Sequence, residues 1–114
     1  YAHALGGTIG TLLRVADSPV PATSEAHARQ IVHANIRIDG VEIAGGDVAP
    51  EQYQRPQGFC VLLGVESEAR VRSVFEALQA GGEVVMAPQR TFFSPCYAIV
   101  VDRFGVPWKI NCGT

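Results

Sequence analysis

The expected elements occur in the same order twice along the chain, each time after a pair of glycines. Gly6-Gly7 and Gly81-Gly82 each follow a helical segment and precede a strand, a loop, a strand, a glycine turn and a last strand. A further strand, residues 59–65, stands before the helix of the second copy. The second copy is therefore a βαβββ unit. The sequence predicts an α+β fold of paired βαβββ modules and argues against a helical bundle.

The first copy lacks its opening strand and most of its helix. We expect a single domain over residues 1–114, made of an incomplete module (residues 1–47), a linker (48–58) and a complete module (59–114). A strand and most of a helix, about 20 residues by ordinary element lengths, are expected before Tyr1.

The clearest helical pattern covers residues 67–80. Its apolar side chains recur at intervals of three and four residues, which puts them on one face: Val71, Val74, Phe75 and Leu78. Ser67 is suited to cap the first turn, and Gly81 to end the last.

Most of the remaining sequence has the pattern of short strands. Residues 31–39 alternate between polar and apolar, and the Asp39-Gly40 pair is typical of a tight hairpin turn. Further strands are expected at residues 8–15, 41–44, 59–65, 83–86, 97–102 and 108–112. Residues 16–30 and 48–58 are polar or rich in proline, and we expect loops there.

Composition excludes several classes of partner. Nine basic and eleven acidic side chains leave a net charge of −2, so no nucleic-acid partner is expected. No apolar run approaches the ~18 residues of a membrane span, so no membrane partner is expected either. The three cysteines, Cys60, Cys96 and Cys112, form no C-x-x-C pair. We expect reduced, largely buried thiols in a cytoplasmic protein.

Residues 102–108 read D-R-F-G-V-P-W and are followed by K-I-N-C. This run resembles the C-terminal signature of PhnB-like proteins, members of the glyoxalase, bleomycin-resistance and extradiol-dioxygenase (vicinal oxygen chelate) superfamily. Supporting matches are L-G-G at 5–7, V-H-A at 32–34, F-E-A-L-Q-A-G-G at 75–82 and M-A-P-Q-R-T-F-F at 86–93. The resemblance covers essentially the whole chain. It implies paired βαβββ modules with a cavity inside a cupped sheet, in agreement with the repeat.

The resemblance also implies a divalent metal held by His or Glu on the first and last strands of each module. The matching positions here hold Phe59, Lys109 and, on residues 41–46, Ile43, with Glu42 one register step away. A phenyl ring has no lone pair to donate, and an ammonium group repels a cation. We therefore predict no cofactor and no metal at the usual site. A bound divalent metal is the alternative, and a register shift would turn Glu42 inward.

The candidate ligand-binding residues come from both modules. His33, Asn35 and Arg37 share one strand face, where Arg37 can clamp a carboxylate or phosphate and His33 can exchange a proton. The alternative is a solvated sheet face. The aromatic and basic candidates of the second module are Phe59, Phe92, Tyr97, Trp108 and Lys109. Core packing explains such aromatic residues equally well.

Three classes of function follow. The first is a protein that binds a small molecule, anionic if Lys109 faces the cavity, without the usual metal. The second is a metal-dependent glyoxalase-type lyase or isomerase, or a dioxygenase. The third is a scaffold for dimerisation or regulation. Phe59 and Lys109 favour the first, and no catalytic residue is assigned. A homodimer is expected, because family members commonly pair and an open sheet edge needs cover.

Overall fold

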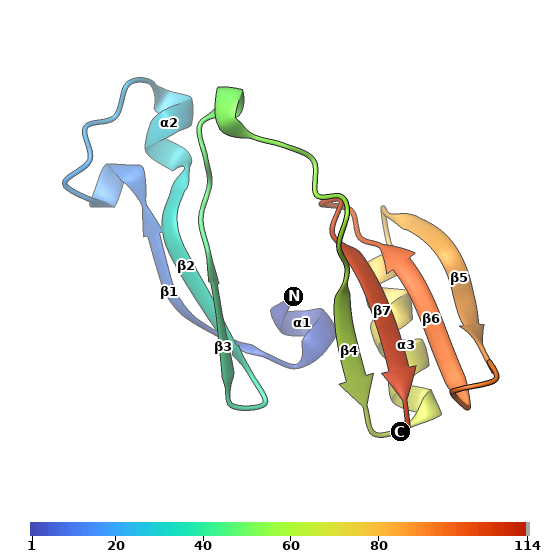
Figure 1. Ribbon diagram of the computed structural model, residues 1–114. Coiled ribbons are helices and arrows are strands. Elements are labelled where there is room, and N and C mark those ends of the chain that lie inside the picture. Colours follow the sequence, from blue (N-terminus) through green and yellow to red (C-terminus); the bar gives the residue numbers. More distant parts are fainter. Residues whose placement is uncertain (114) are drawn as a thin grey trace. The chain divides into compact units, whose positions relative to one another are not determined.

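The computed structural model describes residues 1–113 and divides the chain into two compact units (Figure 1). Unit 1 is Tyr1–Tyr53 and unit 2 is Gln54–Thr114. The division falls inside residues 48–58, the stretch that the sequence predicts as a linker. Each unit is built around its own sheet.

Unit 1 contains a three-stranded antiparallel sheet and several short helices. Its elements are α1 (Ala2–Leu5), β1 (Thr8–Arg14), η1 (Val15–Asp17), α2 (Glu25–Arg29), β2 (Ile31–Ile38), β3 (Val41–Gly45) and η2 (Pro50–Gln52). The strand order is β1-β2-β3. Asp39 and Gly40 join β2 to β3 with φ angles of 48° and 81°. Two positive φ angles in succession are what the expected tight hairpin turn requires.

The loops expected over residues 16–30 and 48–58 contain helical turns, so those two predictions are wrong in part. Ser24 caps α2, because its side-chain oxygen accepts a hydrogen bond from the N–H of His27 at 3.0 Å. In the second loop, η2 begins at Pro50, whose fixed φ suits a first helical position. Helices of three to five residues are too short to show an apolar period, so the sequence pattern does not reveal them.

Unit 2 has the βαβββ order predicted for the second module. Its elements are β4 (Val61–Val65), α3 (Glu68–Gln79), β5 (Glu83–Gln89), β6 (Cys96–Val101) and β7 (Pro107–Cys112). The strand order is β4-β7-β6-β5, in which β4 runs parallel to β7 and the other pairs are antiparallel. The opening strand begins at Val61 rather than at Phe59.

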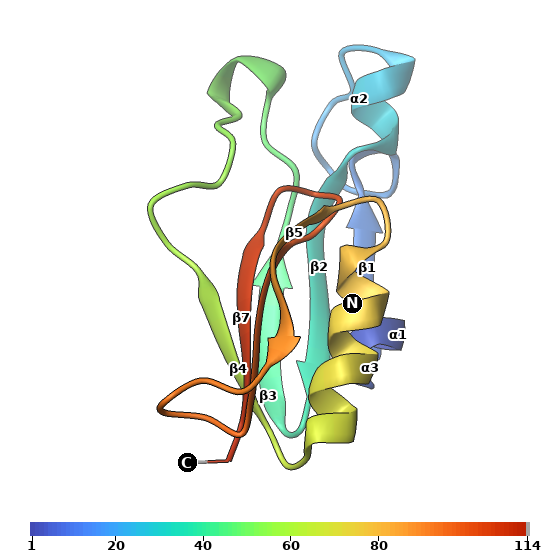
Figure 2. The ribbon, with the colours of Figure 1, turned by 90° about the vertical axis from the view of Figure 1, so that its right-hand side faces the viewer.

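The main core lies between α3 and one face of the unit 2 sheet (Figure 2). The predicted stripe of α3 faces this core, with Val71, Val74 and Leu78 buried. Alternate residues of β6 and β7 are buried on the covered face: Cys96, Ala98, Val100, Trp108, Ile110 and Cys112. Ser67 caps α3 as expected and accepts a hydrogen bond from the N–H of Arg70 at 3.1 Å.

Unit 1 has a much smaller core. Its buried apolar residues are Leu5, Val15 and Ile38, whereas Ile9, Leu12, Val41 and Ile43 are exposed. Full burial of an aliphatic side chain contributes about 1.5–3 kcal/mol, so most of the hydrophobic stabilisation resides in unit 2. None of the helices within residues 1–113 has the length and apolarity needed to cross a bilayer.

The two glycine pairs of the repeat have the same structural role. A Cβ on Gly7 would lie 3.0 Å from the carbonyl oxygen of Arg37. A Cβ on Gly82 would collide with the carbonyl oxygen of Val101. Both glycines therefore let the backbone approach the neighbouring strand closely. This contact makes Arg37 of unit 1 the counterpart of Val101 of unit 2.

Candidate functional site

One face of the unit 2 sheet carries no helix of that unit, and we call it the helix-free face. Side chains alternate along a strand, so Lys109 and Asn111 of β7 project from this face and Trp108 and Ile110 from the other. Their register neighbours on the helix-free face are Ile99 and Tyr97 of β6 and Leu62 and Gly64 of β4. Lys109 and Trp108 therefore lie on opposite faces of the sheet, as the alternation along the strand predicts.

Two polar groups of the helix-free face, one on Lys109 and one on Asn111, have no partner among residues 1–113. Lys109 is the one basic residue in the strands of unit 2, and within residues 1–113 it forms no hydrogen bond or ion pair. Asn111 donates from Nδ2 to the Gly113 carbonyl at 3.2 Å, but its Oδ1 is buried without a partner among the described residues. A buried acceptor left unpaired costs about 1–3 kcal/mol. Lys109 and Asn111 thus offer a cation and an acceptor to a ligand.

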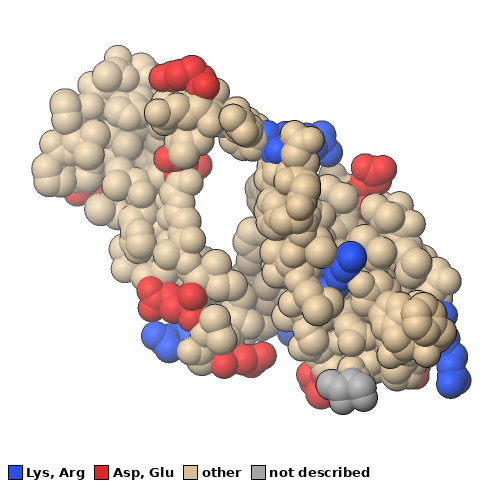
Figure 3. Space-filling view, viewed as in Figure 1, with Lys and Arg blue, Asp and Glu red and all other residues tan. Residues whose placement is uncertain are grey.

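Figure 3 views unit 2 from the side opposite α3 and shows mostly uncharged surface over the sheet. The ammonium group of Lys109 therefore has few competing charges on this face. An anion bound there would meet a favourable field with little cancellation.

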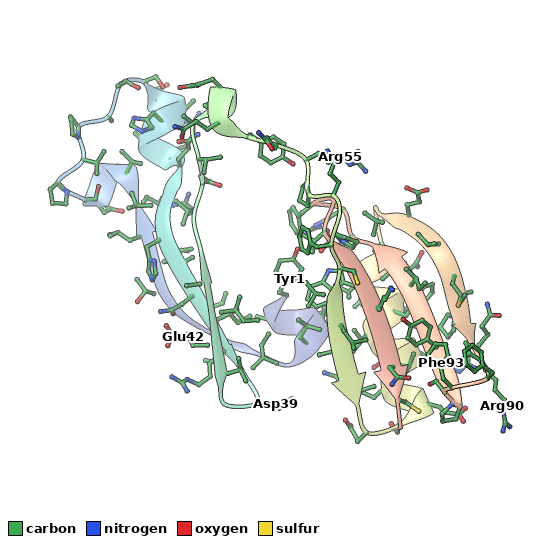
Figure 4. All side chains as sticks on the ribbon, in the orientation of Figure 1. Tyr1, Asp39, Glu42, Arg55, Arg90 and Phe93 are labelled. Carbon is green, nitrogen blue, oxygen red and sulfur yellow. The ribbon has the colours of Figure 1, made fainter. Side chains whose placement is uncertain are left out.

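Aromatic side chains continue from Tyr97 toward the connection between β5 and β6. The rings of Phe93 and Tyr97 meet edge to face, with their centroids 4.8 Å apart, and those of Phe92 and Phe93 do so at 5.0 Å. Figure 4 shows Phe93 at this connection, near Arg90. Phe92 is fully exposed and Phe93 about half exposed, whereas Tyr97 is buried. Phe93 therefore offers apolar surface at this edge of the face, and the buried Tyr97 connects it to Asn111, its own register partner.

Trp108 lies on the covered face of the sheet, away from Lys109. Its Nε1–H donates to Oδ2 of the buried Asp102 at 2.9 Å. The other carboxylate oxygen, Oδ1, accepts hydrogen bonds from the N–H groups of Phe104 and Val106 at 2.9 and 3.0 Å. The D-R-F-G-V-P-W run is thus a turn held together by its own first and last residues. Its role here is structural.

The polar face of unit 1 is an internally bonded network. Asn35 accepts from the N–H of Thr11 at 2.7 Å and donates to Glu42 at 3.3 Å, and Arg37 pairs with Glu42 at 3.5 Å. A hollow of about 420 Å³ is lined by Thr8, Gly10, Thr11, Asn35, Arg37 and Glu42. His33 shares the strand face but is not part of this lining. Arg37, the expected anion clamp, already has a carboxylate partner.

The register of β3 settles which side chains share the Arg37 face. Glu42 is opposite Arg37, whereas Ile43 is opposite Ile36 on the apolar face. Figure 4 shows Glu42 on β3, and Asp39 at the tip of the hairpin. Arg37 corresponds to Val101, and Val101 is opposite Pro107, so Glu42 is the counterpart of Pro107. Two residues further along each strand, Ala44 is the counterpart of Lys109. The expectation that placed the metal-ligand position near Ile43 is therefore wrong by one residue.

The residues at the matching positions do not fit the metal site that the resemblance implies. Lys109 and Ala44 supply no lone pair suited to a divalent cation at neutral pH. Phe59 precedes β4 and is about half exposed. Within residues 1–113 no group of three or more His, Cys, Asp or Glu side chains is arranged to hold a metal ion. We derive no chemistry through a metal at this site.

Cys96 is not an activated nucleophile. Cys96 and Cys112 are buried, free and directly opposite each other, whereas Cys60 is exposed, contrary to the expectation of burial. Burial raises the pKa of the Cys96 thiol, and the nearby guanidinium of Arg72 opposes this only in part. Cys96 therefore stays a neutral thiol, which is a poor nucleophile.

The sequence pattern indicates Lys109 but not Asn111 as a site residue. Alternation places both on one face, yet nothing in a sequence shows that an amide oxygen has no partner. Phe92 and Tyr97 belong to the aromatic edge of the helix-free face. His33, Asn35 and Arg37 lie in unit 1, on a separate sheet.

Comparison with known proteins gives close structural matches. No family model matches the chain. Protein YjdN of Escherichia coli strain K12 is 38% identical over 81 residues, which make up 71% of this chain and 55% of YjdN. The chain thus spans about half the length of that curated relative. Protein PA1353 from Pseudomonas aeruginosa superposes with a TM-score of 0.88 at 34% identity, over 98% of this chain and 83% of that one. The PhnB protein from Bacillus cereus shares the fold, with a TM-score of 0.82 at 20% identity over 99% and 85% of the two chains.

Proposed function

Since the chain belongs to the PhnB-like proteins of the glyoxalase, bleomycin-resistance and extradiol-dioxygenase superfamily, we propose that it binds a small organic anion on the helix-free face of unit 2. The observation that carries this proposal is the pair of unpartnered groups on β7, the Lys109 ammonium and the buried Oδ1 of Asn111. Neither group has a partner among residues 1–113, and a bound ligand would supply one for each.

The two groups specify the ligand. Lys109 attracts a carboxylate or phosphonate through a charge-assisted hydrogen bond. Asn111 Oδ1 accepts from an O–H or N–H group, and the Cα atoms of the two residues are about 7 Å apart along the strand. Phe93, held edge to face by Tyr97, packs against the apolar part of the ligand. The best fit is an acid with an apolar body and one additional hydrogen-bond donor.

The alternative, a metal-dependent lyase, isomerase or dioxygenase, has less support. Lys109 at the ligand position of β7 and Ala44 at its counterpart in unit 1 argue against a four-ligand metal site. We therefore propose binding without metal chemistry. A cytoplasmic location, based on the use of free cysteines, is part of the same proposal.

The test is a binding titration of the 114-residue protein with mandelate, phenylacetate and phenylphosphonate, followed by NMR spectroscopy. We expect the acids to shift amide resonances of β6 and β7. Mandelate should bind about fivefold more tightly than phenylacetate, because its hydroxyl can reach Asn111. Lys109→Gln should weaken binding of all three about tenfold, since it removes the charge-assisted contact.

The matched control is Arg70→Gln, which removes a positive charge from α3 on the other side of the sheet. It should leave the three affinities unchanged. Failure of all three acids to bind, or equal binding by Lys109→Gln, would contradict the proposed function. Equal binding of mandelate and phenylacetate would contradict the role of Asn111 alone.

We also propose that the protein forms a homodimer through unit 1. The outer edge of β3 is unpaired within residues 1–113, and Val41 and Ile43 next to it are exposed. Edges of this kind favour association with another chain. Light scattering at micromolar concentration should give the dimer mass, and Ile43→Lys should shift it to the monomer mass. A monomer in the unsubstituted protein would count against this proposal.

A further inference from the structure

A second hollow lies entirely within unit 1, away from its polar network. It has a volume of about 500 Å³ and is formed by η1, α2, the start of β2 and the segment leading into η2. Figures 1 and 2 show α2 and the turn at residues 50–52 at the same end of the unit. We call this feature the α2 hollow. Its lining residues are Val15, Val20, Thr23, Ser24, Ala26, His27, Gln30, Ile31, Val32, Asp47, Ala49, Pro50 and Glu51.

The α2 hollow has an apolar interior of a size suited to a small molecule. Ligand pockets typically measure about 300–1,000 Å³ and are lined mainly by apolar groups with a few polar ones. Val15, the most buried lining residue, is 4% exposed, and Ile31 is half-buried. Nδ1 of His27 accepts a hydrogen bond from the N–H of Thr23 at 3.0 Å, which fixes the imidazole ring in the wall.

All the formal charge in the lining is negative. Asp47 and Glu51 contribute carboxylates, and neither lysine nor arginine lines the hollow. Asp47 is held rigidly, because its N–H donates to the Ile31 carbonyl at 2.8 Å and its Oδ2 accepts from the Ile31 N–H at 2.7 Å. Neither acid forms an ion pair within residues 1–113. A cation entering the hollow would find two uncompensated carboxylates.

Two of the three arginines of unit 1 have partners outside the hollow, and the third, Arg29 at the end of α2, is not part of the lining. Arg37 pairs with Glu42, and Arg14 donates to the Arg29 carbonyl at 2.6 Å. In Figure 3, acidic but no basic side chains are visible over α2 and the turn at residues 50–52. The charge of the lining itself therefore favours a cation over an anion.

A neighbouring hollow of about 490 Å³ extends this region. It shares Gln30, Asp47 and Pro50 with the α2 hollow and adds Tyr53 to the lining. A tyrosine ring attracts an ammonium group through its electron-rich face. Asp47 lies between an apolar compartment and an aromatic one, which suits a cationic head joined to an apolar body.

We propose that the α2 hollow binds a small organic cation, an ammonium compound with an apolar body. Asp47 and Glu51 pair with the ammonium group, and Val15 and Ile31 contact the body. An organic cation fits better than a metal ion, because the lining is largely apolar and residues 1–113 contain no cluster of metal ligands. This site is separate from the anion site at Lys109 and does not depend on it.

The experiment compares three probes of similar shape and different charge: cyclohexylamine, cyclohexanol and cyclohexanecarboxylate. Each is titrated into the isotope-labelled 114-residue protein at neutral pH, where the amine is positively charged. Cyclohexylamine should shift amide resonances of residues 26–31 and 46–51 and should bind at least threefold more tightly than the other two. Asp47→Asn, which still accepts from the Ile31 N–H, and Glu51→Gln should each weaken its binding about threefold.

Two controls make the result specific. Asp39→Asn removes an acid at the far hairpin of unit 1, where asparagine tolerates the positive φ, and should leave amine binding unchanged. Lys109→Gln, which changes a residue of unit 2 outside the hollow, should also leave amine binding unchanged. Equal binding of the three probes would overturn the proposal, and so would shifts confined to other residues or an unchanged affinity in Glu51→Gln. Glu51 is exposed, so this variant tests the charge without disturbing the fold.

Discussion

Asp102→Ala is expected to lower the free energy of unfolding by about 3–4 kcal/mol. Asp102 is only 5% exposed, and its carboxylate accepts hydrogen bonds from Trp108 Nε1 and from the N–H groups of Phe104 and Val106. Alanine leaves the indole N–H buried without this acceptor and releases the turn. Urea unfolding followed by far-ultraviolet circular dichroism measures the loss.

Glu76→Ala is the matched control for this change. Glu76 is an exposed acid on α3, and its loss should change stability by less than about 0.5 kcal/mol. Asp102→Asn retains one acceptor oxygen and should fall between the two. If Asp102→Ala were as stable as Glu76→Ala, the bonds around Asp102 would contribute nothing net.

Gly82→Ala is the second large expected effect, a loss of about 2–3 kcal/mol. A Cβ at this position would collide with the carbonyl oxygen of Val101 and lie about 3.0 Å from the backbone of Asp102. These are backbone atoms of β6 and the turn after it, so the clash can be relieved only by moving the core strand. Chemical unfolding of the variant gives the magnitude.

Gly64→Ala provides the contrast, because no atom lies within 4 Å of the Cβ it would introduce. Gly64 lies in β4, where alanine restricts the unfolded chain more than glycine does. We expect this variant to match or exceed the original stability by up to about 1 kcal/mol. Similar losses at both positions would mean that close approach to β6 is not what requires glycine at position 82.

The sequence predicts those elements whose pattern is long enough to repeat. α3 shows four apolar residues at helical spacing, and β2 alternates over its whole length, so both are found with nearly correct bounds. α2 spans five residues and depends on one cap bond at Ser24. Such a helix is decided by local contacts and by packing, which periodicity does not report.

The site was predictable where alternation alone decides it. Lys109 and Trp108 are adjacent in β7, so they must face opposite sides, and the sequence indicates as much. The partner of Arg37 depends instead on the register of β2 against β3, which was open to a shift of one residue. The unpartnered oxygen of Asn111 and the two hollows of unit 1 depend on three-dimensional packing, so no sequence pattern reveals them.

The position of Trp108 determines what an optical experiment on this protein can report. It is the chain's one tryptophan, and it lies in the core between α3 and the unit 2 sheet. Unit 1 has three buried apolar residues and contains no tryptophan. Its fluorescent side chains are those of Tyr1 and Tyr53. Tryptophan emission during heating therefore follows the loss of one core and is silent about the other. A midpoint obtained from it describes the better-packed half, and the melting of unit 1 has to be followed by a backbone signal.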